Sequence, residues 1–419
     1  MREMKDSGVE WFGEIGADFE LIKLKNVANI LDEYRKPISA DVRNQDAEVL
    51  YDYYGASGII DKIDGYTIDD HVMLIGEDGA NLLSRNLPLM YEVNGKAWIN
   101  NHAHILKPKE ETDFYYLFYV LESLDVTMYI SGSAQPKLNQ ESLKNIYIPM
   151  PPYRKQRAIA NYIYERSRIL DRVIDKQQAI IEKLKEYKLS IITEKVSHGL
   201  NPCVSTKYSG NEFIGSIPSH WKCVKIKNVS IVVTDGAHVS PETENGVYDF
   251  ISTVNVEQDH IDFDNCLKTT ESSYQYLVST GCRPLSGDVL ISKDGSVGRT
   301  AIVNTDRDFV VSSSLVIIRP KIEMITSEFL NFNLQSAFVQ ETLLMLMHGA
   351  GLRRVSVNKN ANLPVLLPPI EEQKDIVKYL EKKCSDIEKD ITKRRKIVEE
   401  LFMYKKSIIF EVVTGKKEI

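Results

Sequence analysis

Two kinds of hydrophobic pattern alternate along the chain. Short apolar runs at 72–75, 289–292 and 315–320 are separated by segments rich in Gly, Asp and Asn, which is typical of strands joined by loops. Longer mixed segments at 114–124 and 327–346 predict helices. The mixture predicts α+β domains.

Two further stretches contain neither proline nor glycine. A Pro-Pro pair precedes each and a glycine follows each, which is the usual punctuation of a helix, so we expect helices over 153–197 and 370–414. A helix of ~42 residues is ~63 Å long at 1.5 Å per residue. That exceeds what one domain of this size covers, which favours helix packed against helix over two amphipathic helices that each cover only their own domain.

Both helices carry apolar residues at heptad spacing, as a coiled coil requires. One position holds Ile163, Leu170, Gln177, Leu184 and Ile191 in the first helix, and Leu380, Ile387, Arg394, Leu401 and Ile408 in the second. We expect the partner position three residues later, at Arg166, Val173, Ile180, Tyr187 and Glu194, and at Lys383, Asp390, Ile397, Tyr404 and Glu411. Ile174, Ile181, Ile391 and Val398 widen the apolar stripe.

The chain also repeats itself. Residues 7–27, SGVEWFGEIGADFELIKLKNV, match residues 209–229, SGNEFIGSIPSHWKCVKIKNV, at nine of 21 positions with a shift of 202. PPYRKQRAIANYI at 151–163 matches PPIEEQKDIVKYL at 368–380 with a shift of 217. Such self-similarity indicates duplication of a whole unit.

The repeat defines the expected architecture. Two similar globular domains, 1–150 and 201–367, are followed by helical regions at 151–200 and 368–419. Antiparallel packing of the two helices would relate the copies by a pseudo-twofold axis. We therefore expect an α+β fold with two domains separated by an antiparallel two-helix coiled coil.

Motifs for chemistry or membrane insertion are missing from the sequence. We find no Walker motif, no cofactor loop with an Asn-Pro-Pro-Tyr-type motif of methyltransferases, and no nuclease motif outside the predicted helices. Five scattered cysteines suggest neither disulfides nor zinc. No apolar run reaches ~20 residues and the N-terminus has no signal-peptide pattern, so we expect a cytoplasmic protein without catalytic activity, metal or membrane contact.

Further motifs add a family resemblance. They include YYGASGII at 53–60, WINNHAHILKP at 98–108, GSAQPKLNQESLKNIYIPMPP at 132–152 and LISKDGSVGR at 290–299. With the repeated SG-x-E opening and the paired PP-x-x-x-Q helix starts, the whole chain resembles the specificity subunits of type I restriction-modification systems.

The resemblance implies a function in phage defence through DNA recognition. Each domain would be a target-recognition domain that reads one half of a bipartite, asymmetric site in double-stranded DNA. The helices would space the domains and dock two methyltransferase subunits, which hold S-adenosylmethionine and bring in the restriction subunits. The chain itself would need no cofactor.

Several polar side chains fit base or phosphate contact. Residues 132–139 align with 349–356, and Lys293-Asp-Gly aligns with Glu77-Asp-Gly. Gln and Asn suit adenine, whereas Arg and Lys suit guanine. An ordinary surface loop and a plain Asp-Gly turn are the alternatives. Asn100 and Asn101, with His102 and His104 nearby, favour a strand with polar tips over a metal site. The candidates for DNA contact are Gln135, Lys137, Asn139, Asn100, Asn101, Lys293, Arg299, Arg353, Arg354 and Ser356.

Charge qualifies this interpretation. The net charge of −7 divides into −11 for residues 1–150, +5 for 151–200, −3 for 201–367 and +2 for 368–419. Because phosphate contacts supply much of the affinity for DNA, we expect the chain alone to bind DNA weakly. Candidates for docking the methyltransferase lie on the helices, at Lys176, Lys183, Lys393 and Arg395.

Two other functions stay open on the sequence. One is an enzyme, a nuclease or methyltransferase, whose motifs have diverged; DNA cleavage or methylation by the purified chain would favour it. The other is a coiled-coil scaffold without DNA function, which a partner complex lacking sequence preference would favour.

Overall fold

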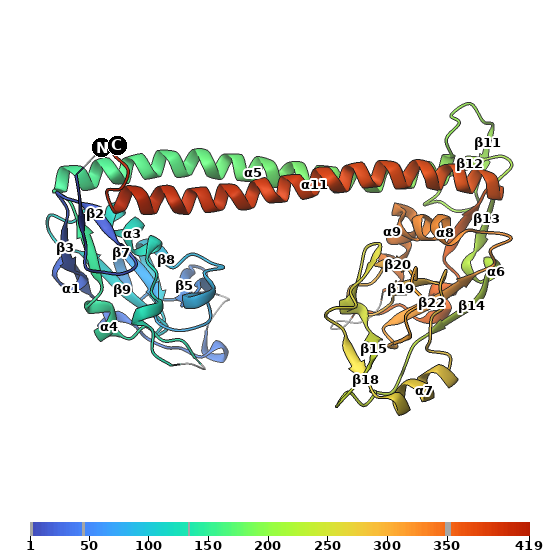
Figure 1. Cartoon of the computed structure of the whole chain (residues 1–419), viewed down its shortest axis with the longest axis horizontal. Helices are drawn as coiled ribbons and strands as arrows, with labels where there is room; N and C mark the ends of the chain where they lie inside the picture. The colour runs from blue at the N-terminus through green and yellow to red at the C-terminus, as the bar shows by residue number, and fades with distance from the viewer. Residues whose placement is uncertain (1–2, 44–46, 133–134, 348–352) are drawn as a thin grey trace. The chain divides into compact units, whose positions relative to one another are not determined.

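A computed structural model describes residues 3–43, 47–132, 135–347 and 353–419. The chain divides into two compact units. Unit 1 comprises Met1–Gln177 and Lys396–Ile419, and unit 2 comprises Gln178–Arg395. Each unit therefore holds one α+β domain and one end of each of the two long helices, α5 (Tyr153–His198) and α11 (Ile370–Val413) (Figure 1).

Unit 1 is built on a six-stranded sheet. Its strand order is β4 (Ala28–Ile30), β9 (Ala103–Pro108), β7 (Ile68–Gly76), β8 (Met90–Ile99), β5 (Tyr51–Gly55) and β6 (Gly58–Ile63). Only β5 and β8 pair in parallel. Two separate pairs are β1 (Met4–Asp6) with β2 (Glu14–Gly16), and β3 (Glu20–Lys23) with β10 (Tyr147–Met150). The short helices are α1 (Leu24–Val27), α2 (Asn81–Ser84), α3 (Phe114–Ser123) and α4 (Gln140–Lys144).

Unit 2 keeps the same plan with a divided sheet. One sheet orders β14 (Ser230–Asp235), β22 (Leu315–Pro320), β19 (Val289–Ser292) and β20 (Thr300–Ile302). The other orders β18 (Leu267–Thr269), β15 (Tyr248–Ile251) and β21 (Phe309–Val311), with β15 and β21 parallel. Three further pairs are β11 (Thr206–Tyr208) with β12 (Ser216–Pro218), β13 (Lys222–Lys225) with β23 (Pro364–Leu367), and β16 (Val256–Glu257) with β17 (His260–Ile261).

The helices of unit 2 are α6 (Ile226–Val229), α7 (Glu271–Ser279), α8 (Ser327–Gln335), α9 (Ala337–Leu346) and α10 (Val357–Ala361). The single helix expected over 327–346 is thus two helices. The chain turns at Ser336, which is buried, has an extended backbone and ends α8 while starting α9.

Antiparallel packing of α5 and α11 is present in both units. In unit 1, Ile163 and Leu170 join one core with Ile408. In unit 2, Ile191 and Leu184 join one core with Leu380, and Ile387 is part of it. The expected coiled coil and its first heptad position are therefore confirmed.

The second heptad position was wrong by one residue. Val173, Tyr187 and Tyr404, expected inside the helix pair, are exposed, whereas Ile174, Ile181, Cys384 and Ile391 are buried. The partner position thus lies four residues after the first, not three. Both rows of side chains contain apolar residues. The row four residues after the first position faces the other helix, and the row three residues after it faces away.

A buried glutamine joins each domain to its long helix. Gln156, 2 % exposed, accepts from the Asp113 N–H through Oε1 (2.8 Å) and donates through Nε2 to the Pro151 carbonyl (3.0 Å). Gln373, fully buried, accepts from Thr326 N–H (3.0 Å) and donates to the Pro368 carbonyl (2.9 Å). The repeated PP-x-x-x-Q motif therefore attaches the helix start to the N-cap of α3 or α8.

Candidate nucleic-acid interface

In unit 1, the Asp-Gly turn after β7 lies against the polar loop before α4. Gly79 N–H donates to the Pro136 carbonyl (3.2 Å), and Leu138 N–H donates to the Glu77 carbonyl (2.7 Å). Asp78 and Lys137 form an isolated bridge between them. We call residues 77–79 with 136–138 loop pair 1.

Unit 2 contains the same arrangement, which we call loop pair 2, residues 293–295 with 353–355. Gly295 N–H donates to the Arg353 carbonyl (3.1 Å), Val355 N–H donates to the Lys293 carbonyl (2.9 Å), and Asp294 bridges Arg354. The turn glycine has a positive φ in both units, 105° at Gly79 and 70° at Gly295, which only glycine adopts at no steric cost. The two loop pairs therefore have the same backbone arrangement, which occurs once in each unit.

Glu77 is a partly buried carboxylate of loop pair 1. Lys137 pairs with it at 3.0 Å, and Arg35 contacts it as well. Burial alone would raise the pKa of Glu77, but the hydrogen bonds from Arg35 and Lys137 outweigh burial and lower the pKa below its ordinary value. The carboxylate therefore stays ionised and holds the Lys137 ammonium in place.

The side chain of His104 is buried and contacts loop pair 1. Its Nδ1 lies 2.7 Å from Asp32 Oδ2 and its Nε2 lies 2.8 Å from the Leu138 carbonyl oxygen. The two contacts hold the imidazole ring between the Asp32 carboxylate and the backbone of Leu138. The contact to Leu138 fixes the backbone beside Lys137 and shows that His104 is a structural residue.

In loop pair 2 a positive charge takes the place of the negative charge of Glu77. Lys293, aligned with Glu77, is 6 % exposed, and its Nζ lies 3.1 Å from Asp294 and 3.6 Å from Asp235. Asp294 in turn binds the Arg354 guanidinium, with Nε donating to Oδ1 at 2.8 Å. The hydrogen bond to Asp294 raises the pKa of Arg354 above its ordinary value, so the guanidinium is charged at any physiological pH.

The structure thus brings four expected side chains to the surface in or beside the loop pairs. Gln135 and Arg353 are exposed, and Lys137 and Arg354 are 51 and 62 % exposed beside their carboxylate partners. Residues 133–134 and 349–352 of the two expected loops lie outside the described residues. Arg299 and Asn101 are also exposed, and Arg299 donates to the Val256 carbonyl (3.4 Å).

Other expected contacts need correction. Lys293 was expected to touch phosphate, but it is buried between two carboxylates and presents no charge to the surface. Asn100 is buried, and its side-chain oxygen accepts from the Asn101 N–H (2.5 Å). Asn139 and Ser356 cap α4 and α10, accepting from Ser142 N–H and Lys359 N–H. The caps use these side-chain oxygens as acceptors, and DNA contact by Asn139 and Ser356 stays a prediction.

Four residues in or beside the loop pairs were not predicted as site residues: Glu77, Asp235, Asp294 and His104. The signal available was the alignment of Glu77-Asp78-Gly79 with Lys293-Asp294-Gly295, which places charged residues at matching positions. Asp235 lies 58 residues before Lys293, and no spacing in the sequence connects them.

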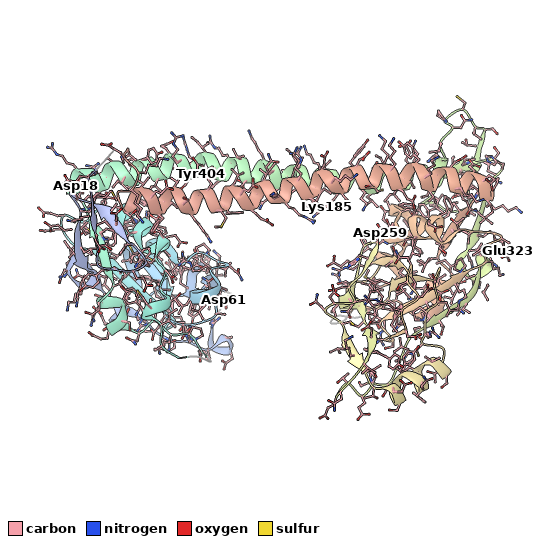
Figure 2. The ribbon with its side chains drawn as sticks, viewed as in Figure 1. Asp18, Asp61, Lys185, Asp259, Glu323 and Tyr404 are labelled. Carbon is pink, nitrogen blue, oxygen red and sulfur yellow. The ribbon has the colours of Figure 1, made fainter. Side chains whose placement is uncertain are left out.

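The long helices present the expected docking side chains to the surface. Lys176, Lys183, Lys393 and Arg395 are exposed, and none pairs with an acidic residue in the part of the chain that the structure describes. The side chains three residues after the first heptad position are also exposed: Tyr404 of α11 (Figure 2) and Tyr187 of α5 are each more than half exposed.

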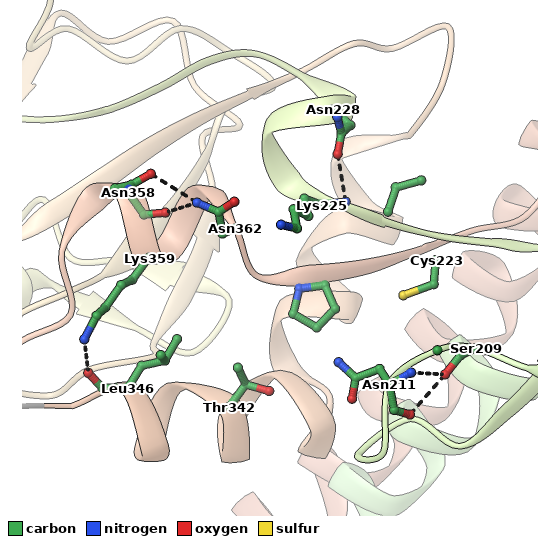
Figure 3. Close-up of a pocket in the computed structure, with 13 residues that line it drawn as sticks. Ser209, Asn211, Cys223, Lys225, Asn228, Thr342, Leu346, Asn358, Lys359 and Asn362 are labelled. Carbon is green, nitrogen blue, oxygen red and sulfur yellow. Dashed lines mark hydrogen bonds between the residues drawn. The ribbon is translucent and has the colours of Figure 1, made fainter.

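Unit 2 also has a hollow of about 860 Å³ beside the repeated opening motif (Figure 3). Ser209, Asn211 and Asn228 line it together with Lys359. Lys359 Nζ donates to the Leu346 carbonyl (3.0 Å), and the Ser209 hydroxyl donates to the Asn211 carbonyl (3.1 Å). Its polar groups therefore serve the local fold.

Two copies of one family model match the chain, over residues 17–193 and 218–397, with the description "Type I restriction modification DNA specificity domain". The chain belongs to this family. Each match contains one domain and most of one long helix, in agreement with the duplication. Members of the family recognise DNA and leave catalysis to other subunits, so the chain is a non-catalytic specificity subunit of a type I restriction-modification complex.

Individual proteins give the same assignment. The chain is 26% identical over 372 residues to S.HindORF215P of Haemophilus influenzae, described as a type I restriction enzyme specificity subunit, with 88% of each chain covered. It is 21% identical over 336 residues to the EcoBI specificity subunit of Escherichia coli, covering 76% of this chain and 68% of that one. A solved structure from a study of type I R-M complex assembly shares the fold, with a TM-score of 0.65, 15% identity and coverage of 95% and 98%. In the described residues no helix is long and apolar enough to cross a bilayer.

Proposed function

We propose that each specificity domain reads one half of a bipartite, asymmetric DNA site, and that loop pairs 1 and 2 are the reading elements. The observation that carries the proposal is their combination of matching backbone and different side chains. The same hydrogen bonds present Lys137, two residues after Gln135, in one unit and Arg353 and Arg354 in the other. A shared frame with unlike donors would select different base sequences at the two halves.

Docking of two methyltransferase subunits follows from the same duplication. Several exposed residues are identical in the two copies, although the loop pairs differ. Examples are Glu10 and Glu212, and Asn26 and Asn228. Identical surfaces suit two copies of one partner. Lys176 and Lys393 occupy equivalent positions on α5 and α11. With Lys183 and Arg395 they would form the charged part of the docking surface. Exposed Tyr187 and Tyr404 would lie beside this charged part.

The chemistry would then belong to the partners. S-adenosylmethionine would bind the methyltransferase subunits, and the restriction subunits would join through them, while this chain needs no cofactor. The acidic balance of the domains, −11 and −3, means that the methyltransferase must supply much of the phosphate contact.

Mapping adenine methylation in a host that expresses the complete system tests the proposal. We expect one motif with two defined halves of different sequence, separated by undefined bases. A continuous motif, or a palindrome with identical halves, would contradict the assignment of one half to each domain.

A further inference from the structure

Arg354 is held in a geometry suited to one particular base. Its Nε donates to Asp294 Oδ1 at 2.8 Å and its Nη2 lies 3.4 Å from Asp294 Oδ2. Asp294 thus occupies one edge of the guanidinium. The N–H groups at its far end donate to no group among the described residues, and the side chain is 62 % exposed. A planar guanidinium held at one edge presents two parallel donors at the other.

The carboxylate that orients Arg354 is itself fixed. The Asp294 side chain is 8 % exposed, and Lys293 Nζ lies 3.1 Å from its Oδ2. The backbone bridge between Asp294 and Arg354 ties the two residues together a second time. An arginine oriented before DNA arrives loses less side-chain freedom on binding, which favours a specific contact over a loose ionic one.

Resting on the proposed function of the loop pairs, we propose that Arg354 recognises a guanine in the half-site read by unit 2, with Asp294 as its positioning residue. Guanine presents two acceptors, N7 and O6, to the major groove, whereas adenine presents one acceptor and one donor there. Two parallel N–H donors match guanine and meet a donor on adenine.

Among the residues of unit 1 that the structure describes, this arrangement has no counterpart. Lys137, equivalent to Arg354, presents a single ammonium held by Glu77. Asp78, equivalent to Asp294, pairs instead with His102 (2.7 Å). An ammonium makes point contacts without the fork that fits guanine. The guanine requirement therefore belongs to the half-site of unit 2, and Asp78→Asn is the matched control for Asp294→Asn.

The test is methylome sequencing of hosts that express the complete complex with wild-type, Arg354→Ala, Arg354→Lys, Asp294→Asn or Asp78→Asn specificity subunit. The wild-type motif should contain a guanine that both Arg354 variants cease to require, with discrimination falling by on the order of 10- to 100-fold at that position. Asp294→Asn should weaken discrimination at the same base pair and at no other. Asp78→Asn should leave that base pair unchanged.

Three outcomes separate the possible failures. A wild-type methylome without a bipartite motif would overturn the proposed function itself. A bipartite motif that none of the Arg354 and Asp294 variants changes would overturn this inference alone and leave Arg354 as a surface ion pair. Uniform loss of methylation in Arg354→Ala that Arg354→Lys restores, with the complex still assembled on size-exclusion chromatography, would show phosphate contact instead of base reading.

Discussion

Lys405 of α11 binds Asp171 of α5, with its Nζ 2.7 and 2.8 Å from the two carboxylate oxygens. The same contact recurs in unit 2, where Lys188 of α5 binds Glu388 of α11 at 2.9 Å. A shift of 217 residues carries Asp171 onto Glu388 and Lys188 onto Lys405, so each ion pair is the duplicate of the other. The two helices therefore pair in the same antiparallel register in both units, and duplication preserved that register.

Exchanging the charges tests this register. Lys405→Glu should destabilise the chain by about 0.5–1 kcal/mol, because it replaces a partly exposed ion pair with a repulsion. Adding Asp171→Lys should restore part of that loss through the reversed pair. Thermal unfolding of the single and double variants measures the coupling, and Lys378→Ala, at an exposed unpaired lysine of α11, is the control. Additive effects of the two charge exchanges would contradict the contact.

Replacing either buried glutamine should destabilise the unit that contains it and leave the other unit unchanged. Gln373→Ala leaves the Thr326 N–H and two carbonyl oxygens without their partner inside the protein, which costs roughly 2 kcal/mol or more. Hydrogen exchange should accelerate in α8 and at the start of α11, and remain unchanged in α3. Gln156→Ala should have the converse effect in unit 1.

A matched control for these variants is Gln275→Ala. Gln275 is exposed and, within the described part of the chain, donates only to Glu271 (2.7 Å), so its loss should change stability by less than about 0.5 kcal/mol. Equal exchange rates for Gln373→Ala and Gln275→Ala would show that the buried glutamine does not join domain and helix.

Cys384 should be an unreactive thiol. Burial against α5 raises its pKa to about 11, so at pH 8 only about one molecule in a thousand carries the reactive thiolate there. Iodoacetamide at pH 8 should modify exposed Cys203 and spare Cys384 until the protein unfolds, as mass spectrometry of the peptides would show. Because the folded pKa is raised, the stability that this thiol contributes is present below its unfolded pKa near 9 and is lost as pH rises through 11. Rapid labelling of Cys384 in the folded chain would contradict the packing of α5 on α11.

Affinity for DNA should depend on the partners. With net charges of −11 and −3 on its domains, the isolated chain should bind its own site far more weakly than the complete complex does at physiological salt. Fluorescence anisotropy over a range of salt concentrations should show a steep salt dependence for the complex. Nanomolar, sequence-specific binding by the chain alone would be inconsistent with the charge balance.

Local signals predicted much of the architecture. Proline, glycine and heptad spacing predicted the long helices, and the observed bounds, Tyr153–His198 and Ile370–Val413, differ from the expected ones by one residue. The duplication predicted two domains of one plan. Strand pairing was not predictable, because β5 pairs in parallel with β8 some 45 residues away and no local pattern specifies that partner.

The errors have identifiable physical causes. The rows three and four residues after the first heptad position both carry apolar side chains. Which of the two rows is buried depends on the side chains of the other helix, and the spacing within a single helix does not contain that information. Lys293 beside an Asp-Gly turn suggested a surface phosphate contact. Its burial follows from Asp235 on β14, a strand that reaches Lys293 only through the fold.

The central claim is that each loop pair reads its own half-site. The most direct measurement is methylome sequencing of two double variants in the complete complex, Gln135→Ala with Lys137→Ala, and Arg353→Ala with Arg354→Ala. We expect the first to relax one half of the motif and the second to relax the other, with the opposite half and the spacing kept in each case. If either double variant altered both halves, or if both altered the same half, the assignment of one half-site to each domain would be wrong.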